Sequence, residues 1–170
     1  MSDQLPPSEL ALSILALSKS IGEKLLQRKW RVATAESCTG GGVAAAITAV
    51  PGSSQWFEYG IVSYANSAKE KLLYVNPHTI QQYGAVSDAV ALEMVGGVLE
   101  LSKADIAVAV SGIAGPTGGT LEKPVGTVLI SWGLATGERD STLNFFSGDR
   151  VHIQQQAVTE ALRGMLLLLN

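Results

Sequence analysis

The segment Thr34 to Gly42 contains the first residues that could do chemistry, because a serine and the only cysteine precede three consecutive glycines. Strand-like residues before this segment and helix-like residues after it place Ser37 and Cys38 at a strand-to-helix turn. Unpaired backbone N–H groups at such a turn can stabilise an oxyanion, so Ser37 or Cys38 could act as a nucleophile. In the alternative interpretation, Ser37 or Thr39 only caps the following helix.

A second segment, Tyr64-Ala-Asn-Ser-Ala-Lys69, places a phenol at the end of a predicted strand and an amine on the helix that follows. The cation of Lys69 could lower the pKa of the Tyr64 phenol, or a desolvated Lys69 could itself be a general base. The alternative is that Tyr64 is only an aromatic residue at a strand end and Lys69 is a solvated lysine.

Two later segments have residues that could bind an anionic ligand. The glycine-rich run from Ser111 to Gly119 follows a predicted strand, where glycines let the backbone approach a ligand closely. It could equally be a surface loop, and Lys123 at its end could add a cation. Arg150 could hold a phosphate with two N–H groups, or it could be a solvated residue after a helix cap at Asp149.

Hydrophobic periodicity and turn residues predict the elements that must position these groups. Helices are predicted over 8–28, 42–50, 66–74, 77–83, 88–102 and 150–169, and strands over 31–36, 57–64, 106–111, 125–135 and 139–146. Asn76, Ser87 and Asp149 are the expected caps of three of the helices. This alternation, with a hairpin near the end, predicts a three-layer α/β/α domain with a mixed sheet.

Length and composition indicate one globular domain over residues 1–170, because 46% of the residues are hydrophobic and 16% are charged. In such a sheet, ligands bind at the carboxyl ends of strands, where the loops 37–42 and 112–119 are expected. A net charge of −3 gives no electrostatic case for a nucleic-acid partner. No apolar run is long enough for a membrane span, so no membrane partner is expected.

Other features of the sequence bear on the location of the protein and on metal and cofactor sites. The amino terminus has early acidic residues and no basic region, so it is not expected to be a signal peptide. A lone thiol is typical of a reducing cytoplasm, which is the predicted location. His78 and His152 have no partners at metal-ligand spacing, and no phosphate-binding P-loop or dinucleotide fingerprint is present. We therefore expect no metal and no cofactor.

Seven short motifs occur in an order and spacing that resemble one protein family. They are Ala-Glu-Ser37-Cys-Thr-Gly-Gly, Gly-Ser-Ser-x-Trp56-Phe57, Val-Ser-Tyr64-x-Asn-x-Ala-Lys69, Gly84-Ala-Val-Ser87, Ser111-Gly-Ile-Ala-Gly-Pro116, Lys123-Pro-Val-Gly-Thr127 and Phe-x-Gly-Asp-Arg150. From about residue 10 to the end, the chain closely resembles the CinA C-terminal-domain family in its stand-alone form, the PncC-type nicotinamide-nucleotide amidases. The amino-terminal half of two-domain CinA proteins is missing, so an activity of that half is not implied.

The resemblance implies an enzyme that hydrolyses nicotinamide mononucleotide to nicotinic acid mononucleotide and ammonia, without a metal. The catalytic serine, tyrosine and lysine of the family match Ser37, Tyr64 and Lys69. We expect the oxyanion to be bound by backbone N–H groups around Thr39, Gly40 and Gly41. The expected contacts of the substrate, and of its phosphate in particular, are the loop residues Ser111, Gly112 and Gly115, together with Arg150.

Two alternatives to this function stay open at the level of the sequence. One is a non-catalytic nucleotide-binding or competence-related module, and the other is an amidase that acts on another carboxamide. Three polar groups together, Ser37, Tyr64 and Lys69, favour an enzyme over a silent module. We also expect a homo-oligomer, and the apolar tail Met165 to Leu169 belongs either to the core or to a subunit interface.

Overall fold

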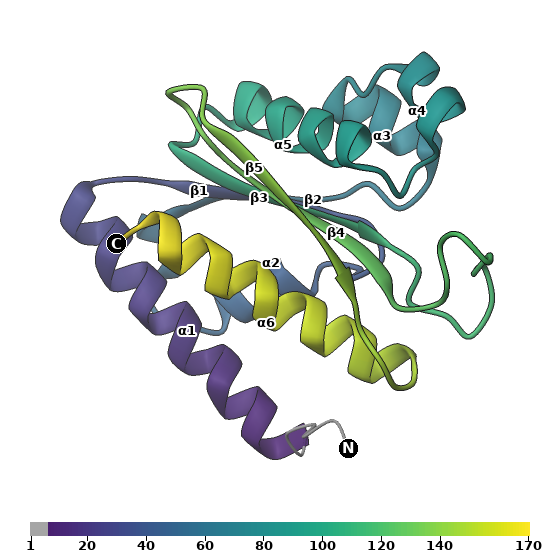
Figure 1. Cartoon of the computed structure of the whole chain (residues 1–170). Coiled ribbons are helices and arrows are strands. Elements are labelled where there is room, and N and C mark those ends of the chain that lie inside the picture. Colours follow the sequence, from purple (N-terminus) through teal and green to yellow (C-terminus); the bar gives the residue numbers. More distant parts are fainter. Residues whose placement is uncertain (1–6) are drawn as a thin grey trace.

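The computed structural model describes residues 7–170, which form a five-stranded sheet with helices on both faces (Figure 1). The strand order is β2-β1-β3-β4-β5. The strands are β1 (Val32–Glu36), β2 (Phe57–Val62), β3 (Ile106–Gly112), β4 (Thr127–Leu134) and β5 (Arg139–Phe145). β1 pairs in parallel with β2 and β3, whereas β4 is antiparallel to β3 and β5. The predicted mixed sheet is therefore confirmed.

The helices form the two outer layers. They are α1 (Pro7–Arg28), α2 (Gly42–Thr48), α3 (Asn66–Leu73), α4 (Pro77–Tyr83), α5 (Asp88–Ser102) and α6 (Arg150–Leu168). In Figure 1, α5 lies on one face of the sheet beside α3 and α4, and α1, α2 and α6 lie on the other face. This is the predicted α/β/α arrangement, and no predicted element end lies more than two residues from the observed end.

Three of the predicted helix N-caps are present, those of α4, α5 and α6, whereas the N-cap of α2 is a different residue from those considered. Asn76, Ser87 and Asp149 each accept a hydrogen bond from a backbone N–H in the first turn of α4, α5 and α6. The N-cap of α2 is Gly41, in the left-handed region at φ 98°, and it has no side-chain cap bond. The interpretation that Ser37 or Thr39 caps α2 is therefore wrong.

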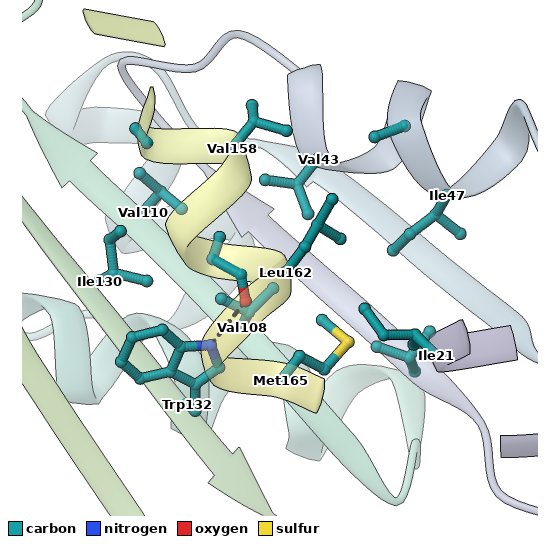
Figure 2. Close-up of a cluster of buried hydrophobic side chains, with 14 of the residues drawn as sticks. Ile21, Val43, Ile47, Val108, Val110, Ile130, Trp132, Val158, Leu162 and Met165 are labelled. Atoms are coloured by element: carbon teal, nitrogen blue, oxygen red, sulfur yellow. Dashed lines mark hydrogen bonds between the residues drawn. The ribbon is translucent and has the colours of Figure 1, made fainter. Parts of the chain in front are cut away.

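Strand alternation sorts the buried side chains into two cores. On the α1, α2 and α6 side, β3 contributes Ile106, Val108 and Val110 to the larger core, part of which is shown in Figure 2. There the Trp132 Nε1 donates to the Ala161 carbonyl over 2.9 Å and joins β4 to α6. On the α5 side, β1 and β3 contribute mostly alanines, which let α5 lie close to the sheet.

The carboxyl-terminal tail belongs largely to the first core. Met165 and Leu169 are fully buried there, whereas Leu167 is exposed. Of the two interpretations of this tail, burial in the core accounts for Met165 and Leu169. None of the helices within residues 7–170 is long and apolar enough to cross a membrane.

Strand direction determines where the loops meet. Because β1, β2 and β3 are parallel, their carboxyl ends lie at the same edge of the sheet. Two antiparallel pairings separate β5 from β3, so β5 also ends at this edge, and α6 begins beside it. Residues from four distant parts of the chain therefore converge at this edge.

Candidate active site

A cavity of about 350 Å³ lies at this edge of the sheet. Its lining includes the predicted residues Ser37, Tyr64, Lys69, Ser111, Gly112, Gly115 and Arg150. The guanidinium of Arg150 and the amine of Lys69 line it, and no aspartate or glutamate does. The charge of the lining therefore suits an anionic ligand.

Lys69 and Ser37 form the polar centre of this cavity. The Lys69 Nζ lies 3.1 Å from the Ser37 Oγ and donates a hydrogen bond to it. Ser37 directly follows β1, and Lys69 lies on the first turns of α3, which follows β2. Parallel pairing of β1 and β2 brings the two residues together, although they are 32 positions apart in the sequence.

Lys69 is buried, with only 1% of its surface exposed. Its amine also donates to the backbone carbonyls of Ser63 at 2.9 Å and Tyr64 at 3.2 Å. Burial lowers the pKa of the Lys69 amine below its ordinary value of 10.5, because desolvation disfavours the charged form. The interpretation of Lys69 as a solvated lysine is therefore wrong. An amine whose pKa is lowered by burial is chemically able to accept a proton.

Glu36 organises the turn that presents Ser37. Its buried carboxylate accepts hydrogen bonds from the Thr39 hydroxyl at 2.7 Å and from the backbone N–H groups of Val43 at 2.9 Å and Ala44 at 2.8 Å. Glu36 thus occupies the first-turn donors of α2, which a side-chain cap would otherwise satisfy. These donors are consequently not available to a ligand.

Cys38, the alternative nucleophile, also lines the cavity, but only 5% of its surface is exposed. Its side chain packs in the larger core, and burial raises the pKa of its thiol to about 12. A thiol with so high a pKa contains very little of the nucleophilic thiolate at neutral pH. Of the two candidates, the geometry favours Ser37.

Tyr64 makes hydrogen bonds to two different residues, one through its backbone carbonyl and one through its hydroxyl. Its carbonyl accepts from Lys69, whereas its hydroxyl accepts from the Arg150 Nη2 at 2.8 Å. The Arg150 Nη1 donates to the Gly115 carbonyl at 2.7 Å, so the guanidinium joins α6 to the loop after β2 and the loop after β3. Tyr64 is 57% exposed at the cavity mouth.

The remaining predicted residues differ in where they lie. Gly112 and Gly115 line the cavity, and so does Ser111, whose hydroxyl donates to the Ala85 carbonyl at 2.8 Å. Thr39, Gly40 and Gly41 do not line it. The Thr39 hydroxyl turns toward Glu36, and the Gly40 N–H donates to the Ser37 carbonyl at 3.0 Å.

Lys123 also lies elsewhere than expected. Its amine donates to the Tyr83 carbonyl at 3.0 Å, and its side chain lines a separate cavity beside β5.

Sequence reasoning did not select several residues of the site. The lining residues that were not expected to contact the substrate are Asn66, Ala85, Val86, Ile113, Ala114, Thr117 and Gly118. All of them lie within or beside the quoted motifs, and this position is the one clue that the sequence offers. Most of them have small or apolar side chains, whose type does not indicate contact with a ligand. Within residues 7–170, no group of three or more histidine, cysteine, aspartate or glutamate side chains could hold a metal ion.

Comparisons with known proteins find relatives that are similar to this chain along most of its length. The model of the CinA C-terminal domain family matches residues 14–169. The chain is 49% identical, over 88% of its length and 91% of the relative's, to a protein of Escherichia coli strain K12 named nicotinamide-nucleotide amidohydrolase PncC. A Pseudomonas putida protein of the same name is 50% identical, over 91% of this chain and 96% of its own length.

Solved structures show the same fold. The crystal structure of the competence/damage inducible protein CihA from Agrobacterium tumefaciens superposes with a TM-score of 0.90 at 40% identity, covering 100% of this chain and 99% of that one. A CinA superfamily protein from Klebsiella pneumoniae gives a TM-score of 0.88 at 38% identity, covering 92% of this chain and 97% of that one.

Proposed function

The chain belongs to the CinA C-terminal domain family, and from this premise we propose that it hydrolyses the carboxamide of nicotinamide mononucleotide. The products are nicotinate mononucleotide and ammonia. Relatives that share about half of its residues are named nicotinamide-nucleotide amidohydrolases. The observation that carries the proposal is the 3.1 Å contact between the Lys69 Nζ and the Ser37 Oγ, in a cavity that the Arg150 guanidinium also lines.

Acylation begins when the Ser37 Oγ attacks the carboxamide carbon. A neutral Lys69 amine accepts the hydroxyl proton as the new C–O bond forms, because burial favours its uncharged form. Lys69 then gives this proton to the amide nitrogen, the C–N bond breaks, and ammonia leaves. Water hydrolyses the resulting ester by the same route, and Ser37 is regenerated.

Backbone N–H groups of the turn after Ser37 stabilise the negative oxygen of the tetrahedral intermediate. The N–H groups of Gly40 and Gly42 already donate to the carbonyls of Ser37 and Thr39. The oxyanion therefore binds to N–H groups of the turn other than these two. In other acyl-transfer enzymes, removal of one such donor costs about 3 kcal/mol.

Arg150 binds the phosphate of the substrate at the cavity mouth. Its two hydrogen bonds go to neutral oxygens, of Tyr64 and Gly115, and a phosphate is a stronger acceptor for a guanidinium. Tyr64 assists Lys69 through its carbonyl and Arg150 through its hydroxyl. In this arrangement Lys69, rather than the Tyr64 phenol, is the immediate base.

The test uses purified protein and nicotinamide mononucleotide, with ammonia and the acid product measured together. We expect Ser37→Ala and Lys69→Met to lose at least about a thousandfold in kcat, because each removes a reacting group. Tyr64→Phe should lose less, since it removes one hydrogen bond to Arg150.

Circular dichroism and thermal melting establish that each variant is folded. Activity that survives in Ser37→Ala would refute the assigned nucleophile and direct attention to Cys38. If the wild-type protein releases ammonia only from other carboxamides, it is an amidase, and nicotinamide mononucleotide is not its substrate.

A further inference from the structure

The peptide that joins Cys38 to Thr39 is held by a residue from the far end of the chain. The Gln154 Nε2, on α6, donates to the Cys38 carbonyl over 2.8 Å, although the two residues are 116 positions apart. Gln154 does not line the cavity that contains Ser37. It lies instead beside Thr39 in a groove between α1, α2 and α6.

The Gln154 hydrogen bond and the Ser37 hydroxyl lie on opposite faces of the sheet. Ser37 follows the alternation of Ala33 and Ala35, which pack on the α5 side, and its hydroxyl bonds to Lys69 of α3 on that side. Gln154 reaches the turn from α6, on the opposite face of the sheet. The Cys38 carbonyl is thus directed away from the reacting groups.

The C=O and N–H of a trans peptide point in opposite directions. A Cys38 carbonyl directed toward α6 therefore turns the Thr39 N–H toward the side on which Ser37 and Lys69 lie. Within the described part of the chain, the Thr39 N–H has no hydrogen-bond acceptor, whereas the Gly40 N–H donates to Ser37. The Thr39 N–H is thus a free donor, and the Gln154 contact sets its direction.

We propose that Gln154 is a positioning residue that orients the Cys38–Thr39 peptide so that the Thr39 N–H stabilises the oxyanion of the amide hydrolysis. This role rests on the proposed function. It adds a residue of α6 that touches neither the substrate nor the reacting atoms. Its effect belongs to the transition state, because a backbone donor aimed at a developing charge acts most strongly there.

The test compares Gln154→Met with Gln156→Met, the same substitution two residues along α6. The Gln156 Nε2 also donates to backbone carbonyls, those of Ser147 and His152. Ser147 precedes α6 and His152 lies in its first turn, so neither belongs to the turn that carries Ser37. Methionine matches the length of glutamine and has no N–H donor. The pair therefore separates loss of the Cys38 contact from general loss of a hydrogen bond on α6.

We expect Gln154→Met to lower kcat roughly tenfold to a hundredfold, somewhat less than removal of an oxyanion donor, with KM changed by less than about twofold. Gln156→Met should retain the wild-type kcat. The substrate in which sulfur replaces the carboxamide oxygen supplies a further readout, because sulfur is a weak hydrogen-bond acceptor. Gln154→Met should slow the amide more than the thioamide, and so reduce the wild-type preference for the amide.

Equal losses in the two variants, or an unchanged amide-to-thioamide ratio in Gln154→Met, would overturn the positioning role. The amide ¹⁵N resonance of Thr39 tests the same contact without any substrate. It should shift in Gln154→Met and stay in place in Gln156→Met. A Thr39 resonance that does not move in Gln154→Met refutes the positioning role even if the enzyme is active. If the resonance shifts but the wild-type protein has no amidase activity, Gln154 still orients the peptide and the proposed function is refuted.

Discussion

Lys69 is the residue whose chemistry depends most on its surroundings. Its amine contacts one hydroxyl and two carbonyls, and within residues 7–170 no carboxylate forms an ion pair with it. Neutral acceptors do not offset the loss of water, so the charged form is disfavoured. A lysine in this environment can act as a base at a pH where an exposed lysine is protonated.

The lowered pKa of Lys69 also predicts how stability depends on pH. Between that pKa and 10.5, the unfolded chain holds a proton that the folded chain has lost, so the free energy of unfolding should rise with pH. Lys69→Met, which cannot titrate, should lack this rise. Urea denaturation of both proteins across this window measures the difference, and parallel profiles would contradict a lowered pKa. The same titration should give kcat/KM an acid limb.

At the scale of single elements, α2 depends on a carboxylate that is not its N-cap residue. Glu36 belongs to the end of β1, yet it accepts from two N–H groups of the first turn of α2. A buried carboxylate with three hydrogen bonds is tolerated because all its donors lie within 2.9 Å. The strand, the nucleophile turn and the helix therefore form one unit.

Glu36→Gln should lower the free energy of unfolding by about 1–3 kcal/mol, because the new NH₂ group faces donors instead of accepting from them. It should also lower kcat, since the turn that carries Ser37 loosens. Ala45→Gly is the control: it weakens α2 by about 1 kcal/mol at an exposed position and leaves the Glu36 contacts in place. Equal kcat values for the two variants would show that the carboxylate only supports the helix.

At the scale of the whole molecule, α6 connects the larger core to the site. Its central and later residues, among them Ala157, Leu162 and Met165, pack in the larger core, as Figure 2 shows for Leu162 and Met165. Its first residues contribute Arg150 and Gln154 to the edge where the cavity lies. The position of α6 against β4 therefore sets the position of two groups in or beside the site.

Gly164 of α6 is the point at which this packing is tightest. A Cβ added there would lie 2.2 Å from the Cζ2 of Trp132, so Gly164→Ala must displace α6 or the indole. We expect a loss of about 1–3 kcal/mol in unfolding free energy. Gly96→Ala in α5 is the matched control, because its added Cβ meets nothing within 4 Å, and it should leave stability unchanged or slightly higher. Thermal melting of both variants checks the contrast, which similar melting temperatures would contradict.

Local features of the sequence predicted most of the fold. Asn76, Ser87 and Asp149 cap the helices expected of them, because a cap bonds to an N–H only two or three residues away. The alternating helices and strands led to the α/β/α layers, and seven ordered motifs indicated the family. The motifs indicate Ser37, Tyr64, Lys69, Gly115 and Arg150 as site residues, and all five line one cavity.

Only the tertiary structure decided how these residues meet. The partner of Lys69 is 32 positions away, that of Tyr64 is 86 and that of Gln154 is 116, and no periodicity within one element reports such distances. The burial of Lys69 beside Ser37 depends on the parallel pairing of β1 with β2. Glu36 bonds to N–H groups of α2 that are 7 and 8 positions away, beyond the reach of a local cap. Residue types thus determined which groups could react, whereas strand direction and packing determined their separation and their loss of water, which set the chemistry available to them.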